Sequence, residues 1–150
     1  MRALILVAAL AACTAEPAKQ DEAPATTAAD GAATTTQQAL AEMPTWETAR
    51  AAGVDFRAIG QEPGWIVDVY TRDRIVALID YGQTRLEFPR SEPTYPAEGS
   101  TRYETQANGH TLSITYRRFP CEDAMSGEAY PSAVEVVIDG RTLNGCGRSV

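Results

Sequence analysis

Large apolar side chains are distributed very unevenly along this 150-residue chain, and their distribution decides which part of it can fold. Residues 13–45 contain two such side chains (Val, Ile, Leu, Met, Phe, Trp or Tyr), whereas residues 46–150 contain thirty. Alanine hides the contrast, because 15 of the 25 alanines lie in residues 1–45. Burial of large apolar groups is what offsets the conformational entropy lost on folding. We therefore expect one modest domain over residues 45–150.

The N-terminus has the pattern of an export signal. Met1 and Arg2 give a short positive start, and residues 3–12 form an unbroken apolar run. Ten helical residues span about 15 Å, half of a ~30 Å hydrocarbon core, so this run is too short for a mature transmembrane helix. Residues 1–12 are therefore predicted to be a signal peptide.

The apolar run ends in Leu10-Ala11-Ala12-Cys13, which resembles the lipobox of bacterial lipoproteins. The resemblance implies cleavage before Cys13, which then becomes diacylated and N-acylated. Two or three acyl chains anchor a protein stably, whereas a single chain binds only marginally. Thr14 follows, in place of the Asp that tends to retain Gram-negative lipoproteins in the inner membrane. The resemblance thus implies a cell-envelope protein, anchored by lipid in the outer membrane and facing the periplasm.

The segment after Cys13 is predicted to be a tether. It is rich in Ala, Thr, Glu and Pro, has no hydrophobic period, and carries one Lys against five acidic residues. Such a composition buries too little apolar surface to fold. We expect residues 13–44 to be lipidated at their start and disordered, with a reach of about 30 Å as a random coil.

Residues 45–150 are predicted to be mainly β. A short helix is expected near residues 45–53, with Thr45 as its N-cap and Gly53 at its end. Apolar and polar residues then alternate with the period of a strand. The predicted strands cover residues 56–59, 65–70, 75–81, 84–88, 101–105, 111–119, 134–138 and 141–145. Asn108-Gly109 predicts a tight hairpin. Seven to eight short strands favour a small antiparallel β-barrel or sandwich with one short N-terminal helix.

Three cysteines are present, and acylation of Cys13 would leave Cys121 and Cys146. In an exported, oxidising context these two are expected to form a disulfide. Closing a loop of about 25 residues would contribute roughly 3–3.5 kcal/mol in the chain-entropy model. A redox or metal pair is the alternative, but neither a C-x-x-C spacing nor clustered histidines support it.

Two segments go beyond a generic β pattern. Residues 56–65 end in Glu62-Pro63-Gly64-Trp65, and residues 121–131 (CEDAMSGEAYP) are followed by DGRTLNGCG at 139–147. Together they resemble a widespread family of uncharacterised bacterial envelope lipoproteins with an early "EPGW" turn and a late "C-x-D-x-M-S … Y-P … G-C-G" signature. The resemblance covers most of residues 46–147 and implies a location and a fold, with no activity attached.

A second resemblance is to the small barrel lipoproteins that inhibit c-type lysozymes. Residues 99–103 (GSTRY) look like the "SGxxY" segment of those inhibitors, and a late cysteine follows. The chain departs from that pattern, because Glu98 stands at its first position and the downstream tryptophan is missing. Inhibition of a c-type lysozyme is therefore kept as an alternative function.

The distinctive segments supply the candidate binding residues, because binding side chains favour loops held on a rigid scaffold. The predicted recognition surface consists of Glu62, Trp65, Asp123, Ser126 and Tyr130. A purely structural interpretation stands beside it. Glu62-Pro63-Gly64 would then make a tight turn, Trp65 would begin a core strand, and the loop polar groups would bond nearby backbone amides.

Catalytic and cofactor chemistry find little support. Lys19, the only lysine, lies in the tether, and His110, the only histidine, follows a hairpin turn without a nucleophile elbow. No metal-ligand spacing or nucleotide-binding glycine loop occurs. The net charge of -7 argues against nucleic acid as a partner. We predict a non-catalytic binding module without cofactors, for an envelope protein or glycan; a carboxylate-dependent envelope hydrolase is the other alternative.

Overall fold

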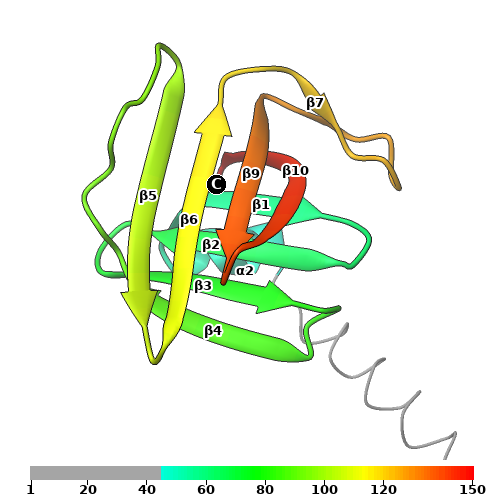
Figure 1. Cartoon of the computed structure of the whole chain (residues 1–150). Coiled ribbons are helices and arrows are strands. Elements are labelled where there is room, and N and C mark those ends of the chain that lie inside the picture. Colours follow the sequence, from blue (N-terminus) through cyan, green and yellow to red (C-terminus); the bar gives the residue numbers. More distant parts are fainter. Residues whose placement is uncertain (1–44) are drawn as a thin grey trace, which may run out of the picture.

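The computed structural model describes residues 45–150, which form a nearly closed β-barrel with one short helix (Figure 1). The predicted signal peptide, the lipidation site Cys13 and the predicted tether lie outside the described residues. The mainly β prediction is confirmed, since 58% of residues 45–150 lie in strands. Within residues 45–150 no helix is long and apolar enough to cross a membrane.

The elements follow the alternating pattern closely. In chain order they are α2 (Trp46–Ala51), β1 (Val54–Gly60), β2 (Trp65–Tyr70), β3 (Arg74–Ile79), β4 (Thr84–Pro89), β5 (Ser100–Ala107), β6 (His110–Arg117), β7 (Cys121–Glu122), β8 (Ala129–Tyr130), β9 (Ser132–Ile138) and β10 (Arg141–Ser149). Two short strands, β7 and β8, were not expected, and β10 runs four residues beyond its predicted end.

Eight strands make one antiparallel sheet in the order β4-β3-β2-β1-β10-β9-β6-β5. Figure 1 shows β5, β6 and β9 crossing β1 to β4 as two layers, with β10 curving from one layer to the other. The two edge strands approach each other, and Thr105 Oγ1 of β5 donates a 2.8 Å hydrogen bond to the carbonyl of Pro89 in β4. This contact helps to cover the edges that an open sheet would leave exposed.

Local chemistry explains the turns and the helix. Thr45 caps α2, since its Oγ1 accepts a 3.2 Å hydrogen bond from the Thr48 amide, and Gly53 leaves the helix at a φ of +85°. Asn108 and Gly109 join β5 to β6 with φ values of +52° and +82°. Successive positive φ values are what a two-residue hairpin turn requires, and Asn and Gly adopt them most easily.

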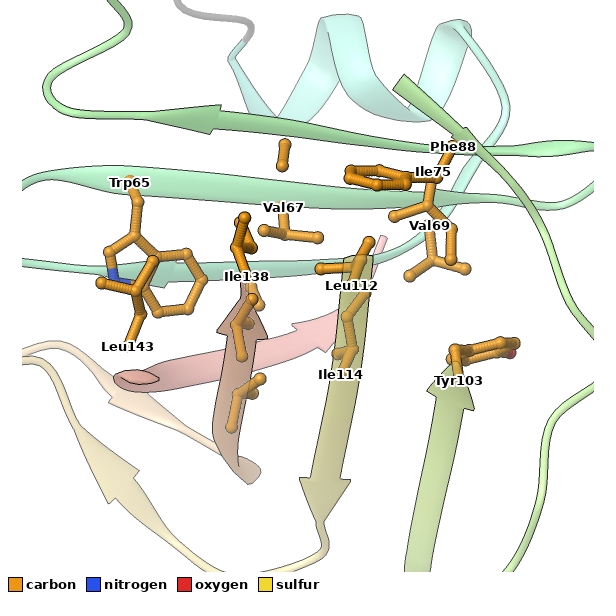
Figure 2. Close-up of a cluster of buried hydrophobic side chains, with 14 of the residues drawn as sticks. Trp65, Val67, Val69, Ile75, Phe88, Tyr103, Leu112, Ile114, Ile138 and Leu143 are labelled. Atoms are coloured by element: carbon orange, nitrogen blue, oxygen red, sulfur yellow. The ribbon is translucent and has the colours of Figure 1, made fainter. Parts of the chain in front are cut away.

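The core fills the space between the two layers. Figure 2 shows side chains of β2 and β3 pointing toward those of β6 and β9, with Trp65 near one end and Tyr103 near the other. Glycine lets the strands approach closely here. A Cβ at Gly145 in β10 would collide with the carbonyl oxygen of Ile59 in β1, and it would also lie too close to the Trp65 ring.

Part of the outer face of β1 and β2 is also buried. Arg57 and Asp68 are register partners with side chains on this face, yet only 2% and 3% of these residues are exposed. Trp46 of α2 lies over Arg57, with 5.4 Å between the guanidinium carbon and the ring centroid. This end of the barrel is therefore three layers thick.

Candidate functional site

The two segments that the sequence singles out are neighbours in the structure. The turn between β1 and β2 carries Gln61 and Glu62, and the loop from Cys121 to Tyr130 carries Asp123. Gln61 Nε2 lies 3.4 Å from Asp123 Oδ1 and donates a hydrogen bond to it. Residues separated by 62 positions thus meet at one place, which we take as the candidate site.

A disulfide fixes the loop to the barrel. The Cys121 and Cys146 sulfurs are bonded, and their Cα atoms are 5.6 Å apart, within the range that a disulfide requires. Cys146 is a buried residue of β10, paired in register with Ile59 of β1. The expected pairing of Cys121 with Cys146 is therefore confirmed, and it ties the loop to the central strands.

Asp123 organises the interior of this loop. Its Oδ2 accepts hydrogen bonds from the Ser126 hydroxyl at 2.7 Å and the Ser126 amide at 2.9 Å. Its own amide donates to the carbonyl of Glu128, and its carbonyl accepts from the amide of Gly127. The Ser126 hydroxyl holds the pKa of the Asp123 carboxyl below its usual value, with smaller contributions from the Ser126 amide and Gln61, although burial opposes the shift. Asp123 is thus a stable carboxylate that shapes the loop.

Tyr130 connects the loop to the helix. Its hydroxyl donates a 2.9 Å hydrogen bond to Glu128 Oε2, while Glu128 Oε1 accepts a 2.8 Å bond from Arg148. The Arg148 guanidinium lies 4.0 Å from the centroid of the Trp46 ring, close enough for a cation–π interaction. Burial, and secondly the bond to Glu128, raise the pKa of Tyr130 to about 12. One contiguous cluster therefore joins α2 to the disulfide loop.

Part of the predicted recognition surface is wrong. Trp65, Asp123 and Tyr130 are 2%, 5% and 3% exposed, so a partner cannot touch them without rearrangement. Trp65 points into the barrel because it begins an inward-facing stripe, and the other two bond within the loop. Glu62 and Ser126 are the exposed members of the predicted set. The structural interpretation of the three buried residues is the one that fits.

A hollow open to solvent lies between the turn and the loop, with a volume of about 380 Å³. It is lined by Gly60, Gln61, Glu62, Cys121, Glu122, Asp123, Ala124, Met125, Asn144, Gly145 and Cys146. Three lining residues were not among the predicted site residues: Met125, which is 70% exposed, Glu122 and Asn144. A methionine among small and polar residues of a disulfide-tied loop was the available signal for Met125.

The hollow is acidic. Glu62, Glu122 and Asp123 line it, and no arginine or lysine does. Asp123 is committed to Ser126 and Gln61, whereas Glu62 and Glu122 are exposed and form no ion pair with any residue from 45 to 150. The hollow therefore presents two free carboxylates beside an exposed thioether.

Metal and histidine chemistry gain no support from the part of the chain that the structure describes. In residues 45–150 no three side chains of His, Cys, Asp or Glu are grouped so that they could hold a metal ion. His110 lies in the β5–β6 hairpin, where its Nδ1 is 2.7 Å from Asp139 Oδ2. This contact and the Thr111 amide lower the pKa of the Asp139 carboxyl. The pair links two hairpin turns at the surface.

The segment that resembles the lysozyme inhibitors is part of the barrel wall. Ser100 and Tyr103 belong to β5 and are 4% and 3% exposed. The Tyr103 hydroxyl accepts a 3.1 Å hydrogen bond from Arg90. Both residues are therefore buried in the structure.

Comparisons of the whole chain with protein-family models, with curated proteins and with solved structures find no match.

Proposed function

We propose that this protein is a lipid-anchored lipoprotein of the cell envelope, and that its barrel is a non-catalytic binding module. In this proposal, acyl chains on Cys13 hold the chain in the outer membrane, and the barrel faces the periplasm. The surface that recognises a partner is the hollow between the β1–β2 turn and the disulfide loop, together with exposed Glu62, Met125 and Ser126.

The contact between Gln61 and Asp123 carries the proposal. It brings the two most distinctive segments of the sequence together around one open hollow. The disulfide and the bonds of Asp123 hold the loop in place, so little ordering entropy would be lost when a partner binds. A loop preorganised on a rigid barrel is a common arrangement for recognition.

The chemistry of the site favours binding over carboxylate catalysis. A general acid that works near neutral pH needs a carboxyl whose pKa is raised by burial or by a neighbouring anion. Asp123, the buried carboxyl at the hollow, has the opposite shift because Ser126 donates two hydrogen bonds to it. A hydrolase that uses Asp123 as an acid is therefore the weaker alternative.

The test uses the full-length chain, purified in detergent, as bait for an envelope extract. After a partner is identified, its affinity is measured for Met125→Ala and for the control Tyr95→Ala, which removes a side chain that is 72% exposed elsewhere. We expect Met125→Ala to lose more than about tenfold in affinity, ~1.4 kcal/mol, and the control to lose none.

Two results would contradict the proposal. One is equal affinity of both variants for every captured partner. The other is reproducible hydrolysis of an envelope polymer by the purified chain, abolished by a single substitution such as Glu62→Gln. Circular dichroism of each variant checks that the barrel is intact.

A further inference from the structure

We infer that the hollow binds a cationic segment of a partner protein that carries an apolar side chain between its basic residues. The inference rests on the proposed function and adds the chemical class of the partner. It follows from the floor of the hollow and from the charges around it.

The floor of the hollow is apolar and lies at the end of the pairing between β1 and β10. The disulfide, Gly60 and Gly145 form the floor of the hollow, and the Trp65 ring packs directly beneath both glycines. With a volume of about 380 Å³, the hollow above this floor is wide enough for an incoming side chain.

Met125 forms an apolar wall of this space. Its side chain is 70% exposed, although exposure of a large apolar group gains nothing in an isolated protein. Methionine is unbranched and polarizable, so it adapts to differently shaped apolar partners and is common at binding surfaces. An aliphatic side chain of the partner would cover both Met125 and the disulfide.

The negative charges around the floor favour a partner that carries positive charge. Glu62 and Glu122 are exposed on opposite segments of the hollow, one on the turn and one on the loop. No arginine of residues 45–150 forms an ion pair with either glutamate, and Arg148 and Arg141 are paired with Glu128 and Asp80. Complementary charge steers association and selects partners, so a segment with one basic residue on each side of its apolar residue fits this arrangement.

The same charges disfavour other ligand classes. Phosphate groups, acidic glycans and anionic lipid headgroups would all be repelled by two unpaired carboxylates at the rim. A neutral apolar ligand would cover the apolar floor but would leave the carboxylates of Glu62 and Glu122 without partners. A basic protein segment uses both features at once.

The experiment measures binding of three fluorescent peptides to the full-length chain in detergent by anisotropy. The first has the core arginine–leucine–arginine, the second replaces both arginines with glutamate, and the third replaces the leucine with glycine. We expect the first to bind most tightly and to lose affinity by more than about tenfold between ~20 mM and ~200 mM salt, since salt screens exposed charges. Each of the other two should bind at least about tenfold more weakly.

Matched double variants locate the site. Glu62→Gln with Glu122→Gln removes the two rim charges, while Glu92→Gln with Glu98→Gln makes the same change in net charge at exposed glutamates of the loop before β5. The first pair should weaken binding of the basic peptide by about tenfold or more, and the second pair should leave it unchanged.

Several outcomes would overturn the inference: no binding of the basic peptide, equal binding of the acidic peptide, or equal weakening by both double variants. Any of these results, combined with an envelope partner whose affinity depends on Met125, would refute the cationic class and leave the binding module standing. If affinity for the captured partners does not depend on Met125, the proposed function itself fails.

Discussion

Arg57 and Asp68 form a two-pronged ion pair across β1 and β2, with Arg57 Nε and Nη2 each 2.7 Å from a different carboxylate oxygen. Both residues are buried, and Trp46 of α2 lies over the guanidinium. Burying two charges is costly unless their geometry satisfies them, and parallel bonds of this kind do so. The pair therefore specifies where the helix docks on the barrel.

Breaking this pair should destabilise the domain strongly. Asp68→Asn removes the charge of the Asp68 carboxylate from the buried pair, so we expect the free energy of unfolding to fall by about 3–5 kcal/mol in urea denaturation. Arg57→Met combined with Asp68→Leu removes both charges and should recover most of that loss. A double variant as unstable as Asp68→Asn would show that the charges themselves are not the cause.

The disulfide should contribute a large part of the stability of the barrel. Cys146→Ala opens the link between the loop and β10, and we expect a loss of about 2–5 kcal/mol in the free energy of unfolding. A reducing agent should produce the same loss in the wild type and none in the variant. If reduction leaves the wild-type denaturation curve unchanged, the disulfide adds nothing to stability.

Tyr130 should ionise only at high pH, and its ionisation should report on the contacts between α2 and the disulfide loop. Its folded pKa of about 12 lies above the ordinary value of 10.0. A raised pKa means that this contribution to stability is fully present below pH ~10 and is lost as the pH rises through ~12. The absorbance of tyrosinate should contain a component near pH 12 that Tyr130→Phe removes and Tyr95→Phe, at an exposed position, retains. Because burial also raises the pKa of Tyr116, a late component of unchanged size in Tyr130→Phe is the result that would contradict the assignment.

Lipidation of Cys13 remains a prediction from the sequence, and it has a direct assay. Cells expressing the protein are labelled with a fatty-acid probe, and the wild type is compared with Cys13→Ser. Label should enter the wild type alone, and the mature wild-type chain should begin at residue 13. Equal labelling, or a mature N-terminus elsewhere, would refute the anchor and with it the proposed location.

Much of the barrel was predictable from local pattern. Alternation placed Val67 and Val69 on the inward face, and the need for positive φ located the Asn108-Gly109 hairpin. The pairing of Cys121 with Cys146 followed from counting cysteines once Cys13 was assigned to the anchor. The strands and the hairpin depend on short-range sequence pattern, and the disulfide had only one possible pairing once Cys13 was set aside.

The tertiary features were out of reach. Alternation in residues 65–70 puts Asp68 on the face opposite Val67 and Val69, but it cannot reveal that Trp46 of α2 lies over the buried ion pair on that face. For Trp65 the sequence left both a recognition surface and a core strand open, and the structure buries its side chain in the barrel. Met125 was overlooked because exposure of a loop side chain depends on how the loop folds back, which hydrogen bonds of Asp123 decide.

The central claim is that the hollow between the β1–β2 turn and the disulfide loop is where the protein meets its partner. The most direct test places a photo-crosslinking amino acid at Met125 in living cells and, as the control, at equally exposed Tyr95. We predict a discrete crosslinked species from position 125 that the Glu62→Gln with Glu122→Gln background weakens, and no such species from position 95. Absence of a crosslink at 125, or the same species from both positions, would contradict the claim.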